Sequence, residues 1–271
     1  MSIYCRPFLK WAGSKFSLLK YILSELPQAD RLIEPFVGSG VVFLNTNYPK
    51  SLLNDKNPYL IELYKQLKRH KYKFIEDARL LFTKSSNKEN YYYKMRDEFN
   101  RQTDSYRRSL IFLYLNRHCY NGLCRFNKSG KFNVPFGRYK EPYFPELGLK
   151  KFLEKIDSAK FTCSDYKLVM DIAKKGDVVY CDPPYAPLSK TANFTNYAVG
   201  GFSIEDQEQL AARAEELSKR GICVVISNHD LPLTRSLYKK ARIVSVKALR
   251  KIGQNVNSRG YVKELIAVFE K

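Results

Sequence analysis

Apolar positions along the chain follow two spacings, one typical of helices and one typical of short buried strands. Helical spacing covers Ser14–Leu26, and a compact apolar run predicts a strand at Arg31–Phe36. The turn Val37–Gly40 comes next, and we expect a helix after it that reaches about Tyr48. Ser51–Asp55 predicts a second strand that finishes on an acid. Strand, glycine turn, helix, strand and acid together form half of a nucleotide-binding α/β unit.

The alternation of strands and helices then stops for about ninety residues, which are helical, tyrosine-rich and basic. This stretch closes with the loop-like segment Asn121–Lys140. Within that segment, Asn127–Gly130 predicts a turn between two short strands, so we expect a β-hairpin there.

The α/β pattern resumes in the last part of the chain. A helix is expected over Ser203–Arg220, because Ser203 and Asp206 form a capping box at its start. Strands are expected at Lys160–Cys163, Val178–Cys181, Ile222–Ser227 and Tyr261–Phe269. The sequence therefore predicts one α/β core, formed by residues 1–57 and 145–271, and an inserted domain at 58–144.

The formal charge changes this picture, because it is +20, with 47 Lys and Arg against 27 Asp and Glu. Residues 58–144 hold 19 basic and 8 acidic side chains, and Arg117–Lys140 holds six basic side chains and no acidic one. Such a patch indicates a polyanionic partner, nucleic acid before a membrane surface. On charge alone, a merely solvated basic face is the alternative.

Composition excludes several other classes. The hydrophobic content of 44% argues against disorder, no apolar run is long enough to span a membrane, and Met1–Lys10 lacks the apolar core of a signal peptide. A soluble intracellular protein is therefore expected. The six cysteines form no C-x-x-C pair, and the three histidines do not lie at ligand spacing near them. We therefore expect reduced thiols and no metal site.

One strand ends in an unusual way, because Val178–Cys181 runs into an acid, two prolines and a tyrosine. An exocyclic amine on a base is a poor nucleophile, since its lone pair is delocalised into the ring. Asp182 and the Pro183 carbonyl could each accept one N–H of such an amine and draw the lone pair toward an electrophile. Pro183 and Pro184 stiffen the chain, and Tyr185 could stack on the flat ring.

Two further segments suit a bound nucleotide. The turn in EPFVGSG follows a strand, and Asp55 ends the next strand, where an acceptor for ribose hydroxyls would lie. Taken alone, Asp55 is better explained as a helix cap or turn residue. In FLKWAGSK, Lys10, Trp11 and Lys15 surround a small turn, and Trp11 is either a buried anchor or a wall of a ligand site.

In this order, FLKWAGSK, EPFVGSG, a basic insert and DPPY resemble the Dam-type DNA adenine-N6 methyltransferases. The resemblance extends to FLYLNRHCYNGLCRFN, FNVPFGRYK, DPPYAPLSKTANFTNY and ISNHD, which match the GATC-specific bacterial branch. It implies a Rossmann-like α/β methyltransferase core with a mixed seven-stranded sheet and an inserted helical and β-hairpin DNA-recognition domain. It also implies S-adenosylmethionine as donor, S-adenosylhomocysteine as product, and direct in-line transfer to a flipped adenine in double-stranded DNA.

The resemblance also assigns residues to the catalytic and cofactor sites. The catalytic tetrapeptide would be Asp182, Pro183, Pro184 and Tyr185. The residues that would bind the cofactor are Trp11, Lys15, Phe36, Gly38, Asp55, Asp165, Tyr166 and Asp182. The protein would act as a monomer, either in the bacterial cytoplasm with the nucleoid or as a phage product.

Reading of DNA would belong to the insert. By the same resemblance, Arg125 recognises a guanine, whose O6 and N7 match an arginine fork. The other DNA contacts that it implies are Leu123 and Pro135 at a thymine methyl group, Tyr120 and Asn121 in the stack vacated by adenine, Lys10 at the first guanine and Arg138 at phosphate.

Two alternatives stay open at this point. A related enzyme could methylate cytosine N4 or a glutamine amide, although such relatives usually begin the tetrapeptide with Ser or Asn rather than Asp182. A DNA-binding protein of the same fold could lack activity, although it would not need to retain Trp11, Lys15, Asp55 and the tetrapeptide.

Overall fold

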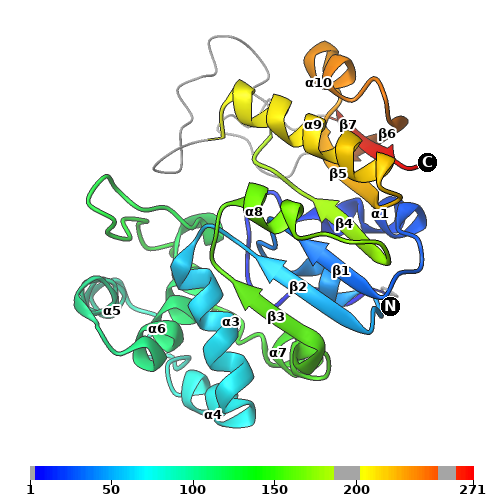
Figure 1. The fold of residues 1–271 in the computed structure, drawn as a ribbon. Helices are drawn as coiled ribbons and strands as arrows, with labels where there is room; N and C mark the ends of the chain where they lie inside the picture. The colour runs from blue at the N-terminus through cyan, green and yellow to red at the C-terminus, as the bar shows by residue number, and fades with distance from the viewer. Residues whose placement is uncertain (1–3, 186–201, 250–260) are drawn as a thin grey trace.

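The computed structural model describes residues 4–185, 202–249 and 261–271, which form a seven-stranded sheet flanked by helices (Figure 1). The order across the sheet is β3-β2-β1-β4-β5-β7-β6, and β7 runs antiparallel to both of its neighbours, while the pairs among β1 to β5 are parallel. The strands are β1 (Arg31–Glu34), β2 (Lys50–Asn54), β3 (Ala159–Thr162), β4 (Asp177–Cys181), β5 (Cys223–His229), β6 (Arg242–Leu249) and β7 (Tyr261–Phe269). The mixed seven-stranded sheet is confirmed.

The strand order of the sheet reverses its direction between β1 and β4. From β1 it continues outward to β2 and β3, and from β4 it continues the other way to β5. Loops leaving the carboxyl ends of β1 and β4 therefore diverge, which is where open α/β sheets bind ligands. At the opposite end, Arg31 clamps the buried Asp177 through Nε (2.9 Å to Oδ1) and Nη2 (2.6 Å to Oδ2).

Both faces of the sheet are covered. Successive side chains of β4 alternate between two hydrophobic clusters, with Val178 and Tyr180 in one and Val179 and Cys181 in the other. The first cluster takes in α1 (Leu19–Glu25), α2 (Val41–Leu44) and the helices that follow β2. The second takes in α8 (Tyr166–Asp171) and α9 (Ile204–Lys219), and α10 (Pro232–Leu237) lies beside α9.

The residues predicted to form an insert fold into four helices that gather at the β3 end of the sheet (Figure 1). They are α3 (Pro58–His70), α4 (Tyr72–Arg79), α5 (Glu89–Arg101) and α6 (Ser105–His118), and α7 (Glu146–Leu153) leads back to β3. Tyr64 of α3 stacks on Phe161 of β3, with ring centroids 5.3 Å apart. A single hydrophobic cluster thus joins the sheet to the insert. The domain boundaries after residues 57 and 144 stay a prediction.

The expected hairpin is present as a turn rather than as two strands. Gly130 N–H donates to the Asn127 carbonyl (2.9 Å), and Phe126 and Phe132 form an isolated bridge. The side chain of Asn100 binds both the N–H (2.8 Å) and the carbonyl (3.1 Å) of Phe132. The N–H and carbonyl of Phe132 therefore point away from Phe126, and the pairing between the two short segments is limited to this one bridge.

Two helices differ from their predicted ranges. Ser14–Leu26 divides into a 3₁₀ turn at Lys15–Ser17 and α1, and the helix expected to reach Tyr48 ends at Leu44. Asn45 closes the latter, because its amide donates to the Val41 carbonyl (2.8 Å) and also pairs with the backbone of Cys5.

At the other end of the chain, the capping box at Ser203 and Asp206 is confirmed. Strand β6 was missed, since it is the edge strand and Val246 is buried among exposed Arg242, Ser245 and Lys247.

A buried acid at the end of β1 should make stability depend on pH. Glu34 is 2% exposed, it accepts a hydrogen bond from Phe43 N–H (2.8 Å), and burial raises its pKa from 4.5 to about 8. The folded state therefore holds this proton where the unfolded chain has lost it. As a result, the free energy of unfolding falls by up to about 1.4 kcal/mol per pH unit across that window.

Glu34→Gln keeps the oxygen that binds Phe43 N–H but removes the titration. Urea denaturation at pH 5 and pH 8 should show the variant gaining stability relative to the parent as pH rises. Equal pH dependence in the two proteins would contradict the buried, protonated state of Glu34.

Candidate active site

Three strand ends bring candidate residues together at the carboxyl edge of the sheet. Asp182 follows β4, Asp55 follows β2, and Gly38 lies in the turn after β1, which is the strand between them. Gly38 N–H donates to Asp55 Oδ2 (3.1 Å), so the acid and the glycine turn are directly bonded. The predicted glycine turn, ribose acid and tetrapeptide therefore share one edge.

Asp182 forms a largely buried ion pair. Its Oδ1 lies 2.8 Å from Lys15 Nζ, and the side chain of Lys15 is only 7% exposed. Lys15 also donates to the Gly13 carbonyl (2.6 Å), and Ser227 Oγ donates to the same Oδ1 of Asp182 (3.2 Å). Both contacts of the Asp182 carboxylate with described residues use Oδ1, which leaves Oδ2 for a ligand.

The surroundings of Asp182 make its carboxylate a good acceptor. Burial raises the pKa of Asp182, the Lys15 ammonium and the Ser227 hydroxyl oppose that rise, and Glu264 adds to it. A carboxylate that is poorly hydrated yet kept ionised by a fixed cation binds an N–H donor more strongly than one in water. Asp182 is therefore prepared to bind a polar hydrogen.

Tyr185 is held on three sides. Its hydroxyl donates to Glu264 Oε2 (2.5 Å), Lys15 Nζ lies 4.3 Å from its ring centroid, and the His229 ring meets it edge-on with centroids 4.5 Å apart. Burial, together with the carboxylates of Asp182 and Glu264, raises the pKa of Tyr185 well above 10. The phenol therefore stays a neutral donor with a fixed ring plane.

The proline pair is anchored from the second half of the chain. Gln207 of α9 donates to the Pro184 carbonyl (2.8 Å) and is 1% exposed. Its own oxygen accepts from Asn228 (3.0 Å), which in turn donates to the Tyr238 hydroxyl (3.0 Å). Within the described part of the chain, the Pro183 carbonyl has no such donor, so it can accept from a ligand.

Trp11 lies on the glycine turn. Gly38 has a positive φ of 46°, and a Cβ atom there would come 2.9 Å from Trp11 Nε1. Only glycine therefore allows the indole to approach this closely. Asp55 uses its other oxygen to accept from Asn57 N–H (3.0 Å), and burial raises its pKa. Asp55 therefore has a structural role in the glycine turn, in addition to any role in binding a ligand.

An aromatic group lies next to the glycine turn. The ring of Phe36 lies 5.2 Å from that of Tyr166 and 5.6 Å from that of Phe202, measured between centroids. Asp165 caps α8 by accepting from Lys167 N–H (2.9 Å), which places it directly before Tyr166. Phe36, Asp165 and Tyr166 are therefore brought together, as the resemblance implies.

Lys10 is joined to the insert rather than to the glycine turn. Its backbone N–H and carbonyl both bind the side chain of Asn116 (2.9 and 2.6 Å), and its ammonium lies 3.8 Å from the Tyr139 ring centroid. Tyr139 also accepts from Asn121 N–H (2.9 Å). The contacts of Lys10 thus bring the N-terminal segment against the predicted DNA-reading loop.

The pair Tyr120 and Asn121 projects from the surface. Tyr120 is 52% exposed, and Asn121 has a positive φ of 53° that turns the chain sharply. Gly122 follows, where a Cβ would clash with Lys10 Cβ at 2.3 Å. The sharp turn and the glycine bring this loop against Lys10 and leave Tyr120 exposed.

Arg125 is fixed by a neighbour that sequence reasoning missed. Its Nε donates to Asn133 Oδ1 (2.8 Å) and its Nη2 to the Asn133 carbonyl (3.3 Å). The outer edge of the guanidinium, formed by Nη1 and the second Nη2 hydrogen, remains available for a ligand.

The other predicted DNA contacts lie on the same loop. Leu123 is half-buried, and Pro135 is exposed and accepts from Tyr120 N–H (2.9 Å). Arg138 is exposed, has a positive φ of 52°, and lies 3.5 Å from Glu89.

One motif that carries the resemblance extends beyond the described residues. The segment DPPYAPLSKTANFTNY lies within them only as far as Tyr185. Across residues 4–185, 202–249 and 261–271, no group of three His, Cys, Asp or Glu could hold a metal ion. Nor does any helix in those ranges have the length and apolar character needed to cross a membrane. All six cysteines are free thiols.

Four supporting residues were not found from the sequence: Ser227, Glu264, Gln207 and Asn133. Two of them stand in motifs that carry the resemblance, Ser227 in ISNHD and Asn133 in FNVPFGRYK. Glu264 and Gln207 stand in ordinary strand and helix patterns, and only the folded chain brings them to the tetrapeptide.

Residues 11–252 match the model of a family described as D12 class N6 adenine-specific DNA methyltransferase. A DNA adenine methylase from Serratia marcescens is 54% identical over 265 residues, which cover 97% of this chain and 98% of that protein. DNA adenine methylases from Vibrio cholerae and Escherichia coli K12 are each 51% identical, and the matches cover 97% and 98% of this chain and 96% and 95% of those proteins.

Matches to solved structures include some that are far less similar in sequence. A precorrin-6y C5,15-methyltransferase from Geobacter metallireducens, for example, is 11% identical with a TM-score of 0.40, over 96% of this chain and 93% of that one. The assignment of a family therefore depends on the sequence relatives.

The anchoring of the proline pair can be tested by stability. Gln207→Leu removes the donor to the Pro184 carbonyl and leaves buried polar groups without a partner, so unfolding should become easier by about 1–3 kcal/mol. The matched control is Gln209→Leu, since Gln209 only binds Glu205 on the surface of the same helix (3.0 Å). That change should stay within about 0.5 kcal/mol in urea denaturation. Equal losses of unfolding free energy in the two variants would show that the bonds of Gln207 add no more stability than a surface contact.

Proposed function

The chain belongs to the D12 class N6 adenine-specific DNA methyltransferases, and we propose that it methylates adenine within 5′-GATC-3′. The methyl donor in this proposal is S-adenosylmethionine. The enzyme would act as a monomer on double-stranded DNA, in the cytoplasm of a bacterium or a phage-infected cell. The observation that carries the proposal is the largely buried Asp182 carboxylate, held by Lys15 beside a rigid proline pair and a fixed tyrosine.

The residues at the carboxyl edge fit the proposed donor. Asp55 keeps lone pairs for ribose hydroxyls in addition to its bonds with Gly38 and Asn57. Phe36 and Tyr166 offer aromatic faces for a purine ring. Trp11 covers the side-chain-free turn at Gly38. When bound, S-adenosylmethionine supplies a methyl group that a sulfonium charge makes electrophilic.

The tetrapeptide would activate the amino group of the target adenine. Asp182 Oδ2 and the Pro183 carbonyl each accept one N–H, which localises the nitrogen lone pair toward the methyl group. As the new N–C bond forms, the S–C bond of the donor would break, and its electron pair would stay on the thioether of the product, S-adenosylhomocysteine. The nitrogen then sheds one proton, and Asp182 is a better acceptor for it than a free aspartate because burial raises its pKa. Tyr185 stacks on the base, with its ring plane fixed by Glu264.

Asn133 supports a role of Arg125 in reading the sequence. It binds one side of the guanidinium, which orients the outer fork toward a guanine in the major groove. Leu123 and Pro135 lie on the same loop and supply apolar contacts for a thymine methyl group. Exposed Tyr120, with Asn121, would fill the stack that the adenine leaves, and Lys10 and Arg138 would contact a guanine and phosphate.

Methylation of a plasmid tests the function directly. After incubation with S-adenosylmethionine, a nuclease that cuts only methylated GATC should cleave the plasmid. Asp182→Ala and Asp182→Asn should abolish this cleavage but leave DNA binding near the parental level, because Asp182 acts on the base amine rather than on phosphate.

The control is Asp171→Asn, since Asp171 is an exposed acid that pairs with Arg213 (3.2 Å) away from the tetrapeptide. This variant should methylate like the parent. Substantial turnover by Asp182→Ala would refute the role of the carboxylate, and a plasmid that stays resistant with the parent protein would refute GATC as the target.

Arg125 and Asn133 should affect discrimination at one and the same base pair. Arg125→Ala should reduce the preference for the cognate pair by about 1–3 kcal/mol, read from kcat/KM on duplexes with single base-pair changes. Asn133→Ala should reduce the preference at the same base pair by a smaller amount, because the guanidinium is still present but no longer oriented. A loss spread evenly over all four positions would instead indicate a phosphate contact.

A further inference from the structure

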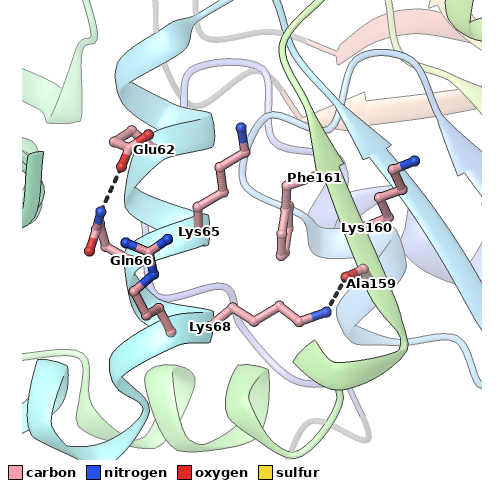
Figure 2. A pocket seen from close by; sticks show the side chains of 8 residues that line it. Glu62, Lys65, Gln66, Lys68, Ala159, Lys160 and Phe161 are labelled. Carbon is pink, nitrogen blue, oxygen red and sulfur yellow. Dashed lines mark hydrogen bonds between the residues drawn. The ribbon is translucent and has the colours of Figure 1, made fainter.

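Tyr180 lies on the same face of the sheet as Asp182, because side chains two positions apart along a strand point the same way. Figure 2 shows this alternation on β3, where Phe161 points toward α3 and Lys160 points away from it. On β5, Ser227 lies two positions beyond the register partner of Tyr180, so it is on that face as well. Tyr180, Ser227 and Asp182 are therefore brought together by the pairing of β4 with β5.

Two hydrogen bonds connect these three side chains in a row. The Tyr180 hydroxyl lies 3.0 Å from Ser227 Oγ, and Ser227 Oγ donates to Asp182 Oδ1 (3.2 Å). A serine hydroxyl has a single hydrogen, and an ionised carboxylate can only accept. The hydrogen of Ser227 is therefore used on Asp182, so Tyr180 is the donor to Ser227.

This row of hydroxyls is closed to water. Tyr180 is 2% exposed and Ser227 is 0% exposed. Across residues 4–185, 202–249 and 261–271, the Tyr180 hydroxyl has no hydrogen-bond partner other than Ser227. Burial and the nearby charge of Asp182 raise the pKa of Tyr180 well above 10, so its phenol stays a neutral donor. The mechanism described above makes no use of this buried hydroxyl.

The bond from Tyr180 acts on Asp182 through Ser227. Successive hydrogen bonds polarise one another, so a hydroxyl that accepts one bond donates a stronger one. The same bond also fixes the rotation of the Ser227 hydroxyl. Ser227 and Lys15 then hold Oδ1 of Asp182 from two elements of the fold, which keeps Oδ2 in place for a ligand.

We propose that Tyr180 is a positioning residue for methyl transfer, which acts through Ser227 to keep the Asp182 carboxylate ionised and its Oδ2 directed at the amino group of the flipped base. The inference rests on the proposed function, because it takes that amino group as the ligand of Asp182. The alternative is a tyrosine that only fills the core beneath the tetrapeptide. Phenylalanine would fill that space equally well.

Other charged or titratable groups also surround this row of side chains. They are Lys15, Glu34, Cys181, Tyr185, His229 and Glu264. Every variant described below retains all six. Glu34 keeps its proton below about pH 8, because burial raises its pKa to about 8, so it is neutral in the acid range. A difference between variants in that range therefore reports on Asp182.

The experiment measures the single-turnover rate of methyl transfer against pH, with the full chain saturated by duplex DNA and S-adenosylmethionine. A hydrogen bond to a charged group corresponds to about 1–2 pH units, and one bond in a row strengthens the next by about 10–30%. Tyr180→Phe removes one oxygen atom and keeps the ring. Its acid limb should move to higher pH by about 0.2–0.5 unit, which lowers the rate on that limb about 1.5- to 3-fold and leaves the plateau unchanged.

A second change tests whether the effect passes through Ser227. Ser227→Ala should move the acid limb further than Tyr180→Phe does, because it removes the bond to Asp182 itself. Adding Tyr180→Phe to Ser227→Ala should then move the limb no further, because the row of hydrogen bonds is already broken.

The matched control is Tyr114→Phe. Tyr114 is 0% exposed, and its hydroxyl donates to the Ser86 carbonyl (2.7 Å) inside the insert, away from the tetrapeptide. This variant loses a buried hydroxyl in the same way, but its acid limb should stay at the parental pH. Urea denaturation of both Phe variants checks that they remain folded.

Three results would overturn the proposal. An acid limb of Tyr180→Phe at the parental pH would mean that the hydroxyl only fills space. An equal shift in the parental and Ser227→Ala backgrounds would mean that Tyr180 acts by another route. An equal shift in Tyr114→Phe would indicate a general effect of losing a buried hydroxyl. Failure of the parent protein to methylate the duplex would instead refute the proposed function, so the two failures are distinguishable.

Discussion

The ion pair between Lys15 and Asp182 is the contact on which the rest of the site depends. It joins the N-terminal segment to the end of β4 across 167 positions of sequence, and it does so where both side chains are largely withdrawn from water. A carboxylate in such surroundings would normally take up a proton. The fixed ammonium of Lys15 keeps the carboxylate charged. A charged carboxylate can accept a hydrogen bond from an amino group on a base.

The site divides its support between the two halves of the chain. The first half supplies the glycine turn, Asp55 and Trp11, which lie around β1 and β2. The second half supplies Ser227 from β5 and Glu264 from β7, which fix the acid and the tyrosine of the tetrapeptide. The antiparallel β7 therefore belongs to the candidate active site, because its insertion beside β5 brings Glu264 to Tyr185.

Local patterns explain what the sequence could predict. Strands β1, β2 and β4 are compact apolar runs that end on a polar residue or an acid, and the glycine turn and tetrapeptide follow them directly. The supporting contacts could not be found in this way. Glu264 lies 79 positions from Tyr185 and Gln207 lies 23 from Pro184, and neither stands out from its own strand or helix. The hairpin was predicted from its turn residues, Asn127–Gly130, but the segments beside that turn form one isolated bridge, Phe126 with Phe132, rather than two strands.

The central claim, that a buried but ionised Asp182 carries the chemistry, is tested most directly by the pH dependence of kcat at saturating substrate and donor. Ser227→Ala removes a hydrogen bond that favours the ionised form, so the pKa of Asp182 rises and the acid limb of the profile should move to higher pH, with the plateau above it unchanged. An equal fractional loss of kcat at every pH, with the acid limb of the profile at its original pH, would contradict the account.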